Sequence, residues 1–170
     1  MKIKLILSHV GNFFKGRNGH KVTRGYFHRT AVKGDTAVGE GNYFHNHWVQ
    51  ASFYKVIDLD GNVVQSVLSQ DAEFAVNQWD ENEISLSYEF TGLNNTPLTS
   101  KQIGAVIADI LSDKATKSIA NHRLLLSEIK ARKVSGWGTH ADITKVYAIF
   151  GGHMDAISES EIAQILKGIK

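Results

Sequence analysis

A hairpin signal between Ala51 and Val67 constrains the fold of this chain more than any other feature. The run Phe53–Leu59 is followed by Asp60-Gly61-Asn62 and then by Val63–Val67. An Asp-Gly pair between β-branched runs is the strongest short-range signal for a β-hairpin. The sequence therefore predicts two antiparallel strands here, around which the rest of the fold must be built.

Two further strands are predicted, one on each side of the hairpin. Lys21–His28 is a short run that ends in two aromatic side chains and a histidine. Ile84–Phe90 alternates between apolar and polar side chains, so one face of this strand carries Ser85, Ser87 and Glu89. A polar face of this kind either meets solvent or forms the floor of a polar cleft.

Helices are predicted to follow the strands. Thr99-x-x-Gln102 and Ser158-x-x-Glu161 are capping-box patterns, and apolar residues at helical spacing follow each of them. Strands followed by covering helices predict an α/β fold with a central mixed β-sheet flanked by helices. The remaining predictions are shorter helices over Leu124–Lys133 and Ala141–Phe150, a helical turn over Asn42–Val49, and a loop over Thr30–Gly41.

Length and composition limit the chemistry. A chain of 170 residues without repeats or linkers is expected to form a single domain over residues 1–170. It contains no cysteine, which excludes disulfides, thiolate nucleophiles and cysteine-rich metal sites. Any metal would therefore be bound by carboxylates and by the eight histidines.

Charge and hydropathy indicate what the chain does not bind. A formal net charge of +2 is too small to predict a nucleic-acid partner. The amino end, MKIKLILSHVGNF, is too short and too polar for a signal peptide, and no stretch is long enough to insert into a membrane. We therefore expect a protein that is made in the cytoplasm without a signal peptide.

The stretch Gly136–Ser158 gathers the ligand types of a zinc site. His140 follows a glycine-rich, turn-prone run, and His153 and Asp155 follow Gly151-Gly152. A catalytic zinc ion needs three protein ligands of this kind and one open position for water. His28, at the end of a predicted strand, is the natural candidate for a further ligand because strand ends are rigidly held.

Five groups of residues also occur in a recognisable order. In that order they resemble the type 2 N-acetylmuramoyl-L-alanine amidases, zinc enzymes that share a fold with the peptidoglycan recognition proteins and include many phage endolysins. Each motif is weak alone, but five in sequence are fairly specific. They are Gly16-Arg17-Asn18-Gly19 with Tyr26-Phe27-His28-Arg29-Thr30, the hairpin from Ala51-Ser52 to Gln65, the strand from Asn82 to Gly92 followed by Thr99-x-x-Gln102, Gly138-Thr139-His140-Ala141-Asp142-Ile143, and Gly152-His153-Met154-Asp155.

The resemblance implies a role for each matching residue. His28, His140 and Asp155 would bind Zn²⁺, Glu89 would be the general base and acid, and His153 would steady the oxyanion. The bond broken would join the lactyl group of N-acetylmuramic acid to L-alanine in peptidoglycan. The protein would then be a monomeric phage or prophage endolysin that reaches the cell wall after its release.

Further residues are expected to support this site. Asp142 could orient a ligand imidazole, and Trp79 and Asn82 could contact glycan or stem peptide, because aromatic faces and amides suit such ligands. Many relatives have a cleft tyrosine at the position of Phe53. The adjacent Tyr54 is therefore assigned to substrate binding, with a one-residue shift of the strand deciding between the two.

Several alternatives remain open. His122 rivals His140 as second ligand, and Ala156 departs from the Pro-Gly that often follows the third ligand. His45-Asn46-His47 resembles an HNH nuclease motif only as a bare tripeptide, and a solvated loop is the preferred interpretation. Two other functions fit the same motifs: a non-catalytic peptidoglycan-binding protein, and a bacterial amidase of cell-wall recycling.

Overall fold

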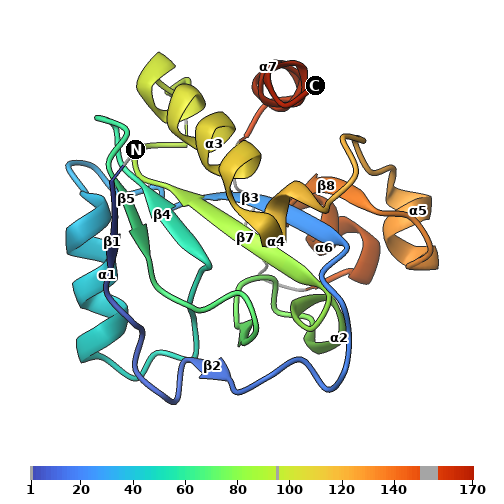
Figure 1. Cartoon of the computed structure of the whole chain (residues 1–170), viewed down its shortest axis with the longest axis horizontal. Helices are drawn as coiled ribbons and strands as arrows, with labels where there is room; N and C mark the ends of the chain where they lie inside the picture. Colours follow the sequence, from blue (N-terminus) through green and yellow to red (C-terminus); the bar gives the residue numbers. More distant parts are fainter. Residues whose placement is uncertain (1, 95, 150–156) are drawn as a thin grey trace.

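The computed structural model describes residues 2–94, 96–149 and 157–170. Within these residues a six-stranded mixed sheet forms the centre of the molecule (Figure 1). All neighbouring strands in it are parallel except β5 and β4, the hairpin around Asp60-Gly61. The strand order is β1 (Ile3–Leu5), β5 (Val63–Gln65), β4 (Lys55–Ile57), β7 (Ser85–Phe90), β3 (Arg24–Arg29) and β8 (Gly136–Thr139).

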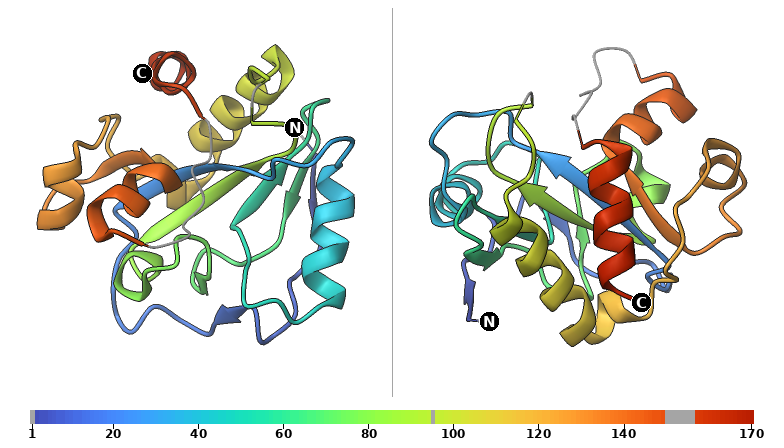
Figure 2. Two further views of the ribbon diagram at one scale, coloured as in Figure 1. Left: turned by 180° about the vertical axis from the view of Figure 1, so that it is seen from behind. Right: turned by 90° about the horizontal axis from the view of Figure 1, so that it is seen from above.

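One face of the sheet is apolar and carries two long helices. α3 (Ser100–Ser112) and α7 (Glu159–Gly168) pack on side chains such as Phe27, Tyr88 and Phe90. Both helices begin with the predicted capping boxes, at Thr99 and at Ser158. Figure 2 shows the two helices together on this side of the sheet.

The opposite face is covered by three other helices. α1 (Ala37–Asn46) packs on β4 and β5 through Ala37, Val56 and Val64. α6 (His140–Tyr147) packs on β3, and α2 (Trp79–Asn82) on β7. The smaller elements are α4 (Lys114–Lys117), α5 (Leu126–Ala131) and the antiparallel pair β2 (Phe13–Phe14) and β6 (Ala72–Glu73).

The mixed sheet with flanking helices confirms the predicted fold class, but two local predictions are wrong. The predicted loop Thr30–Gly41 contains the first half of α1, from Ala37, whereas the second half falls in the predicted helical turn from Asn42. The turn-prone run before His140 is strand β8. Its glycines have a packing role there, because a Cβ on Gly138 would lie 2.8 Å from the Tyr26 ring.

No helix in the described part of the chain combines the length and apolar character that crossing a membrane requires.

Candidate metal centre and substrate cleft

Two histidines from distant parts of the sequence lie together at one edge of the sheet. β3 and β8 are parallel neighbours, so their carboxyl ends meet at the same edge. His28 is near the end of β3, and His140 follows β8 as the first residue of α6. Their ring centroids are 4.9 Å apart and both residues are buried. Two imidazoles at this separation provide nitrogen ligands of the type that zinc prefers.

Glu89 comes to the same edge from the next strand. It is the direct neighbour of His28 in the parallel register of β3 and β7. Directly opposed residues of paired strands point to the same face, which is the face predicted to be polar. Glu89 is buried, and it lines one cleft together with His140. The structure thus brings a carboxylate and two imidazoles together.

The cleft has a volume of about 240 Å³ and continues into a second hollow of about 280 Å³. Gln50, Phe74 and Asn77 line both and form the junction between them. Gln50 and Asn77 each have a φ of 53°, a left-handed conformation that is uncommon for residues other than glycine. Sequence reasoning missed these residues, and only the tolerance of asparagine for this conformation at Asn77 could have indicated one of them.

Phe53, and not Tyr54, borders the histidine pair. The Phe53 ring lies 5.0 Å from that of His28 and lines the cleft. Tyr54 is buried on the other side of the sheet, where its hydroxyl donates to Asp113. Burial and the neighbouring Asp113 carboxylate raise the pKa of Tyr54 well above its ordinary value. The structure does not bring this phenol to the cleft.

The other two predicted substrate contacts differ. Trp79 is accessible to a ligand, whereas the Asn82 side chain forms hydrogen bonds within the protein. Trp79 is 40% exposed and lines the second hollow beside Phe74. Asn82 borders the same hollow but is buried, and its side-chain oxygen accepts hydrogen bonds from the backbone of Ala75 and Val76.

Asp142 has a structural role at the start of α6. It completes a capping box with Thr139, accepting hydrogen bonds from the backbone and hydroxyl of that residue at 2.9 Å. Arg123 forms an ion pair with it, also at 2.9 Å. These contacts fix the helix that begins with His140, so Asp142 supports the position of that imidazole through the backbone.

The histidines that competed for a role lie elsewhere. His122 faces Glu128, with 2.9 Å between its Nε2 and the carboxylate. His45 and His47 are at the end of α1, where their rings contact the backbone carbonyls of Leu7 and Tyr43. His45 is in the last turn of α1 and His47 is the residue that follows it, within the predicted helical turn Asn42–Val49, and both side chains are exposed.

His153, Asp155 and the departure at Ala156 lie outside the described residues. Among the residues that are described, no group of three or more His, Asp or Glu side chains could hold a metal ion. The chain is described again from Ile157, which is buried in the α3–α7 core.

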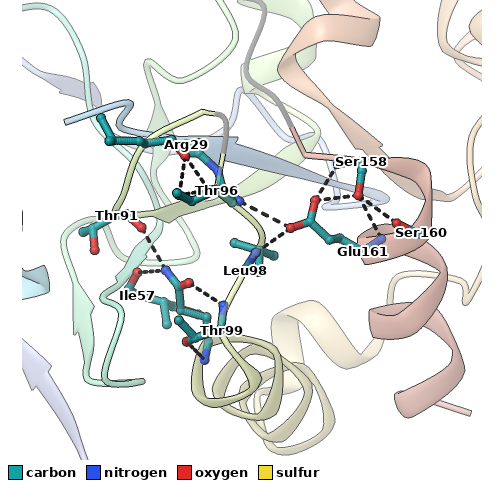
Figure 3. Close-up of polar contacts among 11 residues, drawn as sticks. Arg29, Ile57, Thr91, Thr96, Leu98, Thr99, Ser158, Ser160 and Glu161 are labelled. Atoms are coloured by element: carbon teal, nitrogen blue, oxygen red, sulfur yellow. Dashed lines mark hydrogen bonds and ion pairs between the residues drawn. The ribbon is translucent and has the colours of Figure 1, made fainter. Parts of the chain in front are cut away.

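The start of α7 is tied to β3. Glu161, in the first turn of α7, accepts hydrogen bonds from the backbone and hydroxyl of Ser158 and from the backbone of Leu98. It also pairs with Arg29, the residue after His28, at 3.4 Å (Figure 3). The first turn of α7 is thus linked to β3 at the residue that follows His28.

Neither a protein-family profile nor a curated protein sequence matches this chain, but solved structures do. The hydrolase AmiA of Staphylococcus aureus, solved with its ligand, matches with a TM-score of 0.70 and 15% identity over 99% of this chain and 83% of that one. An AmpD derivative matches with a TM-score of 0.62 and 12% identity, over 96% of this chain and 93% of that one. The endolysin amidase LysCS of Clostridium intestinale matches with a TM-score of 0.54 and 12% identity, over 89% of this chain and 97% of that one.

The chain has the fold of these amidases. Since the identities are low, the likeness is one of fold, and it covers almost the whole of the described structure. The amidase fold explains why β3, β7 and β8, which are far apart in the sequence, lie side by side.

Proposed function

We propose that this chain is a zinc-dependent N-acetylmuramoyl-L-alanine amidase that hydrolyses peptidoglycan, with residues 1–170 as one catalytic domain. The observation that carries the proposal is the convergence of His28, His140 and Glu89 at one edge of the sheet, beside a cleft. The amidase fold supports it, because the solved structures that share this fold include named N-acetylmuramoyl-L-alanine amidases and endolysins.

We assign the zinc ligands as His28, His140 and Asp155. The two imidazoles supply nitrogen ligands that suit this ion, and a carboxylate completes a three-ligand catalytic set. Asp155 is assigned from the resemblance of Gly152-His153-Met154-Asp155 to the segment that ends on the third ligand in the amidase family. When bound there, zinc would supply Lewis acidity and an activated water.

The remaining steps belong to the protein. Glu89 takes a proton from the attacking water and passes it to the nitrogen of the leaving L-alanine. The new bond joins the water oxygen to the lactyl carbonyl carbon, the carbon–nitrogen bond breaks, and the second water proton also passes to the amine, so the products are a carboxylate and an ammonium group. His153 is proposed to donate a hydrogen bond to the oxyanion. Trp79, beside the cleft, contacts the glycan or the stem peptide.

The metal assignment is tested by metal analysis of the purified protein. We expect about one zinc per chain, because one three-ligand site is proposed. His28→Ala should lose the zinc and reduce dye release from labelled cell walls by at least about 100-fold, since even residues around metal ligands cost 10- to 100-fold when changed. His122→Ala is the matched control and should keep both the zinc content and the rate of dye release of the wild-type protein.

The same measurements separate the alternatives. Full zinc in His28→Ala would contradict the site. Wall association that chelator does not affect, without release of peptide, would instead identify a peptidoglycan-binding protein, for which Phe53 at the cleft wall is the favouring observation. Turnover of soluble muropeptides but not of intact sacculi would identify an amidase of wall recycling.

A further inference from the structure

A single buried carboxylate joins the elements that carry the two histidines. Glu81, in α2, is fully buried. Arg24 of β3 donates to both of its oxygens at 2.9 Å, and the Tyr26 hydroxyl donates at 2.8 Å. Tyr147 of α6 donates from its hydroxyl at 3.0 Å, and Arg132, just after α5, donates from Nε at 3.1 Å. Figure 1 shows α2, α5 and α6 gathered at the β8 end of the sheet.

These contacts connect directly to the histidine pair. Arg24, Tyr26 and His28 alternate along β3 and therefore point to the same face of the sheet. His140 and Tyr147 are the first and last residues of α6, seven positions apart, so they lie nearly in line along one side of that helix. Glu81 therefore binds β3 near its first residue and α6 at its last residue, whereas the two imidazoles lie at the opposite ends of these two elements.

Arg132 gives a second, independent indication that this arrangement is specified. Its φ is 55°, a left-handed backbone conformation that is energetically unfavourable for arginine. In that conformation its guanidinium reaches Asp80 at 2.7 Å as well as Glu81 and the Tyr147 hydroxyl. Burial raises the pKa of Tyr147, which keeps its hydroxyl protonated and able to donate.

Stability alone is a weak explanation for such a cluster. Buried ion pairs often contribute no more to folding than apolar residues of the same volume would, whereas they hold a particular geometry. Here the geometry held is that of α6 against β3, and the separation of 4.9 Å between the imidazole rings depends on it.

We propose that Glu81 is a positioning residue, whose carboxylate sets the distance between His28 and His140 by holding α6 against β3. This inference rests on the proposed function in so far as the two histidines are zinc ligands. The positioning itself concerns only the protein and can be measured without metal.

The test compares two phenol-to-phenylalanine variants with the wild-type protein. Tyr147→Phe removes the link between α6 and Glu81 at a partly buried position. Tyr88→Phe is the matched control, because it removes a phenol hydrogen bond to another buried carboxylate, Asp109, on the opposite face of the sheet. Glu81→Gln tests the carboxylate directly.

Two readouts are needed on folded protein. The first is the zinc dissociation constant from competition with a chelating indicator. We expect it to rise by about 10- to 100-fold in Tyr147→Phe and Glu81→Gln, the usual cost of changing residues that orient metal ligands, and to stay unchanged in Tyr88→Phe. The second is the NMR cross-relaxation between the ring protons of His28 and His140 in metal-free protein, which should weaken in the first two variants only.

The outcomes are distinguishable. Unchanged cross-relaxation in Tyr147→Phe, or an equal loss in Tyr88→Phe, would overturn the positioning role. If wild-type protein bound no zinc and released no peptide, the proposed function would fail, while the ring-proton measurement would still decide the role of Glu81. Should Glu81→Gln not fold, Tyr147→Phe alone carries the test.

Discussion

Glu73 is a buried acid whose pKa makes the stability of the fold depend on pH. Its side chain is fully buried, and the nearest cation is Arg17, whose Nη2 lies 3.3 Å from the carboxylate. Burial raises the pKa of Glu73 to about 7, although Arg17 acts in the opposite direction. Most bonds of the Arg17 guanidinium go elsewhere, to the backbone carbonyls of Ser69, Asn82, Glu83 and Ser85.

This residue predicts a dependence of stability on pH. The folded protein holds the Glu73 proton more tightly than the unfolded chain, so stability falls as the pH rises from about 4.5 to about 7. Over that range the unfolding free energy of Glu73→Gln should gain about 3 kcal/mol relative to wild type, since each pKa unit corresponds to about 1.4 kcal/mol. Urea denaturation of both proteins at several pH values measures the difference. A difference that does not change with pH would contradict the prediction.

At the scale of elements, α7 is docked through the first turn of its helix. The carboxylate of Glu161 closes the capping box with Ser158 and also holds Leu98 and Arg29. Burial acts to raise the pKa of Glu161, but hydrogen bonds from Ser158 and Leu98 outweigh it and lower the pKa overall. The stabilisation is therefore present above the ordinary pKa of a glutamate and is lost as the pH falls through the lowered value.

Removal of this carboxylate should loosen α7. Glu161→Ala is expected to cost about 2 kcal/mol of unfolding free energy at neutral pH, because it removes a cap and leaves buried donors without their acceptor. Glu159→Ala is the control: it removes a charge of the same sign from the same helical turn, but its side chain is 75% exposed. Chemical denaturation of the two variants should separate them, and equal losses would show that only the helix-end charge matters.

The elements found from the sequence are those whose signals are local. Both capping boxes, the Asp-Gly hairpin and the alternating strand β7 were predicted because neighbouring residues determine them. The first half of α1 was missed, since Gly39 and Gly41 lower its helix propensity. It forms through packing, with Gly41 close against Val64. β8 was missed because four residues with two glycines carry no strand signal before they pair with β3.

The same limit applies to the candidate site. The family resemblance implied that His28 and Glu89 would share one site, but the choice between Phe53 and Tyr54 depended on a one-residue shift of the strand that the sequence leaves open. The chain bends at Tyr54, whose carbonyl accepts from both Ser66 and Val67. Consequently Tyr54 and Lys55 both reach Asp113 on the α3 side, and Phe53 is left facing His28. A bend of this kind follows from tertiary contacts and has no signature in the sequence.

At the scale of the whole molecule, the two faces of the sheet have different tasks. The face under α3 and α7 is the main apolar core, and the opposite face carries His28, Glu89 and the cleft. Because parallel pairing fixes which side chains face which way, the core can hold the strands in register while the polar face remains available for chemistry. Changes on the two faces should therefore have separable effects.

A pair of variants measures this division. Ile110→Ala, on the buried face of α3, should cost about 3 kcal/mol of unfolding free energy by leaving a cavity, and should leave the turnover of the folded protein unchanged. Glu89→Gln should reduce the rate of wall hydrolysis by about 10²- to 10⁴-fold, because the proton can no longer be transferred, while zinc content is kept. Denaturation curves and initial rates on the same preparations give both quantities. If Ile110→Ala lowered turnover as strongly as Glu89→Gln, the core would be shaping the site directly, and the separation of the two faces would be wrong.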